Sequence, residues 1–160
     1  MVDTEDHSAI PEPILSGSVP DFEYSELNKG DRIGTGGEAN VYEASLTVGD
    51  TSYKLAVKEP RVDGTVQTKV FEEFEQEAET WANLDDHQNI VSVYGYGSES
   101  VPWIGLEYMH GGTLGDNDID FEEGLWLAGR IAEGIRYGHR HGIAHLDLKP
   151  SNILLRETPD

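Results

Sequence analysis

The chain of 160 residues is long enough for one ordinary domain, and its net charge of -20 argues against nucleic acid or an anionic membrane as a partner. It contains no cysteine, which excludes disulfide bonds and thiolate metal sites. The acidic first residues do not resemble a signal peptide and no apolar run reaches about 18 residues, so we expect a cytoplasmic protein without a membrane segment.

Residues 1–24 are predicted to form a flexible acidic leader. They hold Pro11, Pro13 and Pro20, with Ser-Gly-Ser between them and acidic residues throughout. A segment of this composition buries too little apolar surface to offset the entropy lost on ordering it. The folded part is therefore expected to start near residue 25.

A glycine-rich stretch occupies residues 34–37, and Val41 lies just beyond it. Because glycine has no Cβ, a turn between two strands can bring its backbone N–H groups against phosphate oxygens here. Val41 is then placed to cover one face of a flat base. A plain β-turn is the alternative interpretation, since glycine-rich hairpins are common.

A second hairpin is predicted at Gly49-Asp50, between strands at 41–48 and 51–58. The second strand ends in the apolar run Leu55-Ala56-Val57, followed by Lys58. A lysine buried at the end of such a strand needs an anionic partner. The alternative is an edge-strand lysine in solvent.

A helix is predicted over residues 68–84, because apolar residues recur there at spacings of three and four. Its apolar face consists of Phe71, Phe74, Ala78, Trp81 and Ala82. Glu77 lies next to this face and is the preferred partner for Lys58, with Glu73 as the alternative one turn earlier. The remaining glutamates are interpreted as a solvated acidic face.

Two further strands are predicted at 91–96 and 103–108, and Gly111-Gly112 after them would let two parts of the molecule pivot. A long helix begins at Asp120, since acidic residues in a first turn suit the helix dipole, and ends at Gly142. Its predicted buried stripe consists of Leu125, Ala128, Ile131, Ala132 and Ile135.

One short segment, residues 145–152, places Asp147, Lys149 and Asn152 within six residues. A carboxylate can orient a hydroxyl and accept its proton, a cation can offset phosphoryl charge, and an amide oxygen can hold Mg²⁺. Pro150 restricts the loop and disfavours helix at Lys149, so the three side chains can point to one side. Phosphoryl transfer is the indicated chemistry, and a strand is predicted at 153–156.

In order and spacing, these elements resemble the eukaryotic-type (Hanks-type) serine/threonine protein kinases. The glycine stretch is similar to G-x-G-x-x-G-x-V, with Ala39 at the third glycine. Residues 56–58 are similar to the V-A-I-K strand, and 145–152 to H-R-D-L-x-x-x-N. The resemblance implies an α+β, two-lobe fold with an N-lobe at 25–106, a hinge at 107–112 and a truncated, mainly helical C-lobe at 113–160. The N-lobe would be a five-stranded antiparallel sheet with one helix.

The resemblance also implies ATP and Mg²⁺ as cofactors and a protein Ser or Thr hydroxyl as substrate. Asp147 would orient and deprotonate the hydroxyl, Lys149 would stabilise the transferred phosphoryl group and Asn152 would hold Mg²⁺. Lys58, held by Glu77, would position the α- and β-phosphates. The other implied nucleotide-binding residues are Ile33, Gly34, Thr35, Gly36, Gly37, Val41, Ala56, the gatekeeper Leu106, and the backbone of Glu107 and Met109.

Two departures from the family pattern qualify this interpretation. Leu146 stands where the family usually has Arg, which argues against control by activation-loop phosphorylation. The D-F-G motif, which supplies the main Mg²⁺ ligand, does not follow Asn152 within the 160 residues. We therefore expect part of an active kinase that is inactive as a fragment, with a nucleotide- or partner-binding module without turnover as the alternative.

The acid excess carries one further expectation, about the source of the protein. At about 1 M salt the electrostatic screening length falls to about 3 Å, which removes most of the self-repulsion of a strongly charged chain. With 31 acidic and 11 basic residues, the composition suits a salt-rich cytoplasm. A halophilic prokaryote is the predicted source.

Overall fold

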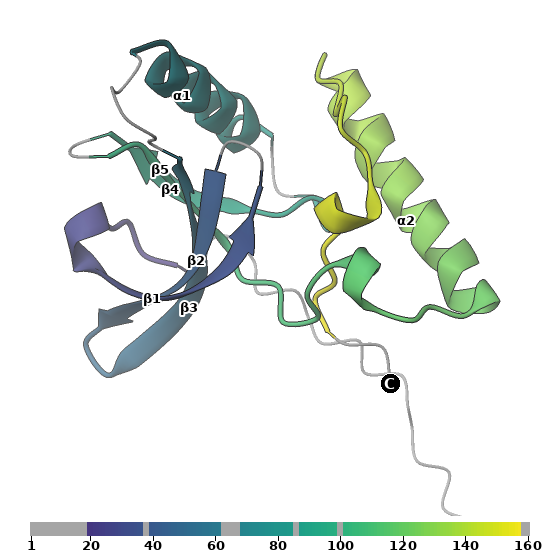
Figure 1. The fold of residues 1–160 in the computed structure, drawn as a ribbon, viewed down its shortest axis with the longest axis horizontal. Helices are drawn as coiled ribbons and strands as arrows, with labels where there is room; N and C mark the ends of the chain where they lie inside the picture. Colours follow the sequence, from purple (N-terminus) through teal and green to yellow (C-terminus); the bar gives the residue numbers. More distant parts are fainter. Residues whose placement is uncertain (1–18, 37–38, 62–67, 85–86, 99–100, 158–160) are drawn as a thin grey trace, which may run out of the picture.

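The computed structural model describes residues 19–36, 39–61, 68–84, 87–98 and 101–157. Figure 1 shows a twisted sheet with helix α1 beside it, and a second part built on the long helix α2. The glycine at position 37 and residues 1–18 lie outside the described residues.

The sheet has five strands, all antiparallel, in the order β1-β2-β3-β5-β4. The strands are β1 (Leu27–Thr35), β2 (Ala39–Val48), β3 (Thr51–Pro60), β4 (Val93–Gly97) and β5 (Trp103–Glu107). Val48 pairs with Thr51, so only Gly49 and Asp50 form the turn, and Gly49 has the positive φ of 60° that such a turn favours. The predicted α+β fold and this hairpin are confirmed.

Helix α1 (Thr68–Ala82) packs on one face of the sheet, as its apolar spacing predicts. Phe74 and Ala78 are buried against a cluster that includes Ala56, Ile104 and Leu106. The predicted start at residue 68 is confirmed, whereas the helix ends at Ala82, which is exposed, rather than at residue 84.

The opposite face of the sheet is covered by residues that the sequence analysis assigned to the leader. The rings of Phe22 and Tyr24 lie 5.6 and 5.8 Å from the Trp103 ring. Gly105 leaves room for this contact, because a Cβ there would lie 3.0 Å from Phe22. The leader boundary at residue 24 is therefore wrong, since apolar rings this close to a buried Trp belong to the folded domain.

A polar cluster ties the same N-terminal segment to strands β1 and β3. The Tyr24 hydroxyl donates to the buried Glu59 carboxylate at 2.5 Å, and Lys29 Nζ lies 3.0 Å from the same oxygen. Burial raises the pKa of Tyr24, because it disfavours the ionised phenolate. The short 3₁₀ helix η2 (Tyr24–Glu26) is thereby anchored to the sheet.

The second part contains the 3₁₀ turn η3 (Leu114–Asp116), helix α2 (Phe121–Arg140) and the 3₁₀ turn η4 (Pro150–Asn152). Asp120 caps α2 by accepting hydrogen bonds from the backbone N–H groups of Glu122 and Glu123 at 2.8 and 2.9 Å. Gly142 follows the helix with a φ of 77°. Both predicted ends of this helix are confirmed.

The predicted buried stripe of α2 is wrong at Leu125, Ala128 and Ala132, whereas Ile131 and Ile135 are half-buried. Leu125 is 67% exposed and Ala128 and Ala132 are also exposed, while the buried residues are Gly134 and Gly138. A Cβ at Gly134 would lie 2.8 Å from the backbone oxygen of Asn89, so the loop before β4 packs closely here. Periodicity defines an apolar face, but this loop covers a different, glycine-lined face.

The strand predicted at 153–156 is also wrong. In its place Leu154 forms an isolated bridge with Thr113, after the 3₁₀ turn η4. The bridge pairs this segment with the residue that follows the hinge, and not with a strand of the sheet. Within the described ranges, no helix has the length and apolar character needed to cross a bilayer.

Candidate active site

The three side chains singled out at residues 147–152 meet in the structure. The Asp147 carboxylate accepts hydrogen bonds from Lys149 Nζ at 2.8 Å and from Asn152 Nδ2 at 3.0 Å. The same Asn152 nitrogen donates to the Asp147 backbone oxygen at 2.9 Å. Lys149 is extended (φ -156°, ψ 159°), as expected before a proline, and Pro150 begins the turn that brings Asn152 back.

Asp147 is held in its ionised form. The hydrogen bond from Lys149 is the main cause that lowers the pKa of this carboxyl below its ordinary value, and the Asn152 hydrogen bond acts in the same direction. Since all three side chains are exposed, an incoming hydroxyl can reach them. An exposed carboxylate that is ionised at neutral pH can orient such a hydroxyl and accept its proton.

Asn152 is the residue here that fits Mg²⁺. Its amide nitrogen donates to Asp147, so its amide oxygen is the atom that could bind a cation. Mg²⁺ prefers oxygen ligands and commonly combines one or two protein groups with waters and substrate phosphates. No cluster of three or more His, Asp or Glu side chains suited to a metal occurs in the described part of the chain. A single amide oxygen fits an ion whose other ligands are waters and substrate phosphates.

Leu146, between His145 and Asp147, combines two unfavourable features. It is 94% exposed and has a φ of 57°, the left-handed region that costs a non-glycine residue about 1–2 kcal/mol. The amide of Asp147 donates to the His145 oxygen at 2.8 Å across this residue. The loop around Asp147 is therefore strained at Leu146.

The structure pairs Lys58 with Glu77. Lys58 Nζ lies 2.6 Å from Glu77 Oε1, and the Lys58 side chain is only 22% exposed. The alternative partner Glu73 instead pairs with Lys69, at 3.3 Å on the same helix. Lys58 lies opposite Val41 in the sheet, which places this ammonium next to the strand that follows the glycine stretch.

Of the glycine stretch, Gly34 lies in β1 and Gly36 lies between β1 and β2. The amide of Gly36 donates to the Ala39 oxygen at 2.9 Å and narrows the turn. Gly34 lies opposite Val41, where a Cβ would lie 3.5 Å from the valine Cβ. Ile33 and Thr35 are exposed on either side, so the backbone of this turn is accessible.

Apolar residues line the sheet next to this turn. Ala56 and Leu106 are buried and lie opposite each other on β3 and β5, with Val41 packed against the same cluster. The amide of Glu107 already donates to Ser92 O at 2.9 Å, so only the Glu107 carbonyl oxygen could serve an adenine. Met109 O accepts from Gly112 N at 3.4 Å, which leaves the Met109 amide for that role.

Gly111 and Gly112, the pair that the sequence analysis predicted as a pivot, have different surroundings. Gly111 is buried, its amide donates to Leu155 O at 2.9 Å, and a Cβ there would overlap the Glu157 carbonyl oxygen. Gly112 has a φ of 68° with nothing near its missing Cβ. Gly111 thus allows close packing against residues 155–157, which form a clamp on the hinge, and Gly112 allows a turn.

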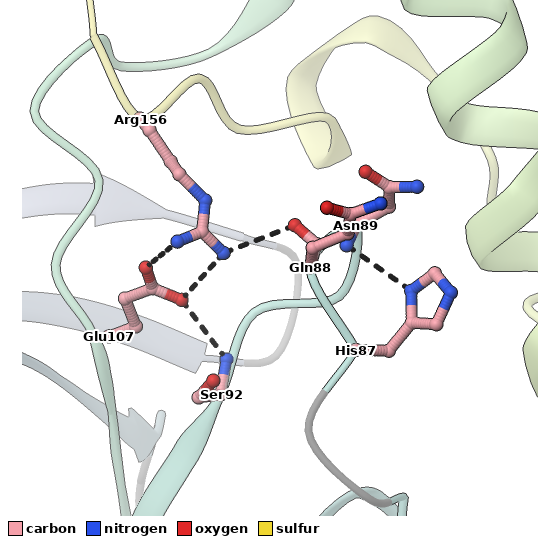
Figure 2. Close-up of polar contacts among 6 residues, drawn as sticks. All are labelled: His87, Gln88, Asn89, Ser92, Glu107 and Arg156. Carbon is pink, nitrogen blue, oxygen red and sulfur yellow. Dashed lines mark hydrogen bonds and ion pairs between the residues drawn. The ribbon is translucent and has the colours of Figure 1, made fainter. Parts of the chain in front are cut away.

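Sequence reasoning missed the residue that completes this clamp, Arg156. Figure 2 shows its guanidinium against the Glu107 carboxylate, with Nη1 donating at 2.6 Å and Nη2 at 3.3 Å. The available signal was a single cation directly after the apolar run 153–155. Its partner lies 49 residues away in the chain, so the pair could not be identified from the sequence.

The sequence of this chain is similar to those of known protein kinases. Residues 27–160 match the family model of the protein kinase domain. The serine/threonine-protein kinase PrkC of Bacillus subtilis is 36% identical over 129 residues, covering 77% of this chain and 19% of that protein. The serine/threonine-protein kinase PknJ of Mycobacterium tuberculosis is 30% identical over 128 residues, covering 77% and 21%.

A plant protein is also similar over most of the chain. The leucine-rich repeat receptor-like protein kinase PXC2 of Arabidopsis thaliana is 30% identical over 154 residues, covering 89% of this chain and 15% of that protein. The chain thus spans about a fifth of the length of the curated relatives that it matches.

Proposed function

The chain belongs to the protein kinase family, and we propose that the full-length protein transfers the γ-phosphate of ATP to a Ser or Thr hydroxyl of a protein. One observation carries the proposal: the Lys58–Glu77 pair and the Asp147–Lys149–Asn152 cluster are both assembled in one structure. Phosphoryl transfer depends mainly on positioning and on charge stabilisation, which these two groups supply.

In this mechanism Asp147 orients the substrate hydroxyl and takes its proton. The freed oxygen forms a bond to the γ-phosphorus as the bond from that phosphorus to the ADP oxygen breaks. Lys149, 2.8 Å from the Asp147 carboxylate, faces the same place and offsets charge on the moving phosphoryl group. Mg²⁺ held in part by Asn152 would neutralise phosphate charge when bound.

The nucleotide is proposed to lie between the glycine turn and the hinge. Lys58, oriented by Glu77, supplies the cation for the α- and β-phosphates. Val41, Ala56 and Leu106 supply an apolar surface for adenine, with the Glu107 carbonyl and the Met109 amide at its edge. Ile33 and the backbone of residues 34–36 lie on the phosphate side.

The test is phosphate transfer by the purified full-length protein from labelled ATP to a basic and to an acidic protein substrate. Asp147→Asn should lower kcat by at least about 100-fold, since the base and its charge are lost. Asp118→Asn, which removes an exposed carboxylate after η3, is the matched control. ATP binding without transfer by the wild type would favour a binding module instead, and absence of both would refute the proposal.

We also propose that the protein acts in a salt-rich cytoplasm, on the strength of its net charge of -20. Screening in concentrated salt should relieve the repulsion among its carboxylates. Thermal unfolding is then expected at a higher temperature in molar KCl than in dilute buffer. A Tm that does not rise with KCl would contradict this part of the proposal.

A further inference from the structure

The Glu107 carboxylate connects segments that are far apart in the chain. Arg156 donates to both of its oxygens, at 2.6 and 3.3 Å, and the Ser92 amide lies 3.4 Å from Oε2. The second Arg156 nitrogen also donates to the backbone oxygen of Gln88 at 3.2 Å. Figure 2 shows the guanidinium between the end of β5 and the loop that leads into β4.

This contact is largely removed from solvent. Glu107 is 8% exposed, and the Arg156 side chain is 35% exposed. A carboxylate buried to this extent requires a charged or hydrogen-bonding partner, and a guanidinium provides two parallel donors with a fixed direction. Arg156 therefore sets the position of Glu107 as well as neutralising its charge.

The segment that carries Arg156 is itself attached to the hinge at several points. The amide of Leu155 donates to Gly112 O at 2.9 Å, and the amide of Leu114 donates to Ile153 O at 2.8 Å. The segment begins at Asn152, which bonds the catalytic Asp147. Residues 152–156 thus contact the catalytic loop through Asn152 and contact Glu107 through Arg156.

We propose that Arg156 is a positioning residue that sets the hinge backbone at Glu107, and through it the affinity for the adenine end of the nucleotide. The inference rests on the proposed function, because Glu107 contacts adenine only if ATP is the ligand. Its physical basis is that the Glu107 side chain and carbonyl belong to one residue, so the ion pair restrains the orientation of the carbonyl.

Loss of the Arg156–Glu107 ion pair should weaken the binding of the adenine base and not the binding of the phosphates. The cation on the phosphate side, Lys58, is held by Glu77 on α1, and the glycine turn is closed by its own backbone hydrogen bond. Neither of these contacts involves Arg156. Loss of Arg156 should therefore lower the affinity for adenosine and leave the affinity for a bare triphosphate unchanged.

The experiment measures competition against labelled ATP in the full-length protein, using adenosine and magnesium tripolyphosphate as separate competitors. Arg156→Met should raise the Ki of adenosine about tenfold, the ratio expected for a lost charge-assisted hydrogen bond, with the Ki of tripolyphosphate unchanged. Arg156→Lys, which keeps the charge but not the fork, should give an intermediate Ki. Arg140→Met removes an exposed cation in the last turn of α2 and is the matched control.

A second measurement tests whether Arg156 acts through Glu107. In a Glu107→Gln background, the adenosine effect of Arg156→Met should shrink, because the charge that Arg156 restrains is gone. If Arg156→Met does not fold, as judged by circular dichroism, Arg156→Lys carries the test with the same two competitors.

The outcomes separate the two proposals. Wild-type protein that binds adenosine, combined with Arg156 variants that change neither Ki or change both equally, would overturn the positioning role and leave the proposed function intact. Wild-type protein that binds neither ATP nor adenosine would overturn the proposed function, and the positioning role with it.

Discussion

Replacing Gly111 by alanine should disrupt the contact between the hinge and the segment after the catalytic loop. The new Cβ would lie 2.7 Å from Leu155 Cβ and would overlap the Glu157 carbonyl oxygen. Because the nearest atoms include backbone atoms, side-chain rotation cannot relieve the clash. The hinge and the segment at residues 155–157 must therefore move apart.

The cost can be worked from the contacts that separation breaks. The hydrogen bonds from Gly111 N to Leu155 O and from Leu155 N to Gly112 O contribute about 1 kcal/mol each. Overpacking of a close contact adds about 1–3 kcal/mol. The expected local destabilisation is therefore about 3–5 kcal/mol.

Two other glycines give matched controls with different expected results. Gly112 has a φ of 68° and open space around its Cβ position, so alanine there should cost only about 1–2 kcal/mol of backbone strain. Gly129 lies inside α2 with nothing within 4 Å of its Cβ position, so alanine there should stabilise the helix by about 0.5–1 kcal/mol.

The assay is native-state hydrogen exchange of the full-length protein, with opening free energies read from peptides that cover residues 105–116, 125–135 and 150–157. Gly111→Ala should lower the opening free energy of both the first and the last peptide, while Gly129→Ala should raise that of the middle one. If Gly111→Ala proved as stable as Gly112→Ala, the close packing described here would be refuted.

Three further predictions concern the active site. Lys58→Met should lower kcat/KM for ATP by about 100- to 1,000-fold. It should change the unfolding free energy by no more than about 1 kcal/mol, because the ion pair of Lys58 is partly exposed. Lys69→Met, which breaks an exposed ion pair on α1, should leave turnover unchanged. Lys149→Met should raise the pKa of Asp147, since the lysine hydrogen bond is what mainly lowers it. The stability that this lowered pKa contributes is present above the ordinary carboxyl pKa and is lost as pH falls through the folded value. The variant should therefore be less stable than the wild type at neutral pH, and the difference should disappear in acid. A carboxyl NMR titration with an unmoved midpoint would contradict this. Leu146→Gly should raise the unfolding free energy measured in urea titrations by about 1 kcal/mol, because it removes the strain of a left-handed backbone at an exposed residue. A loss of stability would instead show that the Leu146 side chain makes a stabilising contact.

Local patterns were sufficient for much of the fold. The turn at Gly49-Asp50 located the β2–β3 hairpin and the period of three to four located α1, while acidic residues from Asp120 and a glycine at 142 located the ends of α2. Asp147, Lys149 and Asn152 were found together because they lie within six residues, where a proline turn alone can bring them to one side. The match to the protein kinase domain over residues 27–160 agrees with the family inferred from these motifs.

Errors arose where a segment's partner lies far away in the chain. The apolar residues of α2 have a helical period, yet the loop before β4 packs on Gly134, and Gly138 is buried next to the backbone oxygen of Ile143. Phe22 and Tyr24 were assigned to the leader because nothing near them in sequence shows the Trp103 ring on which they pack. The contact of Gly111 with residues 155–157 was likewise not predicted, because its partners lie more than 40 residues away in the chain.

The sequence by itself determined the family, most of the order of elements and the candidate catalytic segment, because these follow from short-range spacing and local backbone preference. Only the tertiary structure decided between Glu77 and Glu73 as the partner of Lys58 and brought Arg156 to Glu107. Both choices depend on which side chains converge after the chain has folded, and the Arg156 pair spans 49 residues. Side-chain pairing over such a separation is set by packing between elements, which no local pattern records.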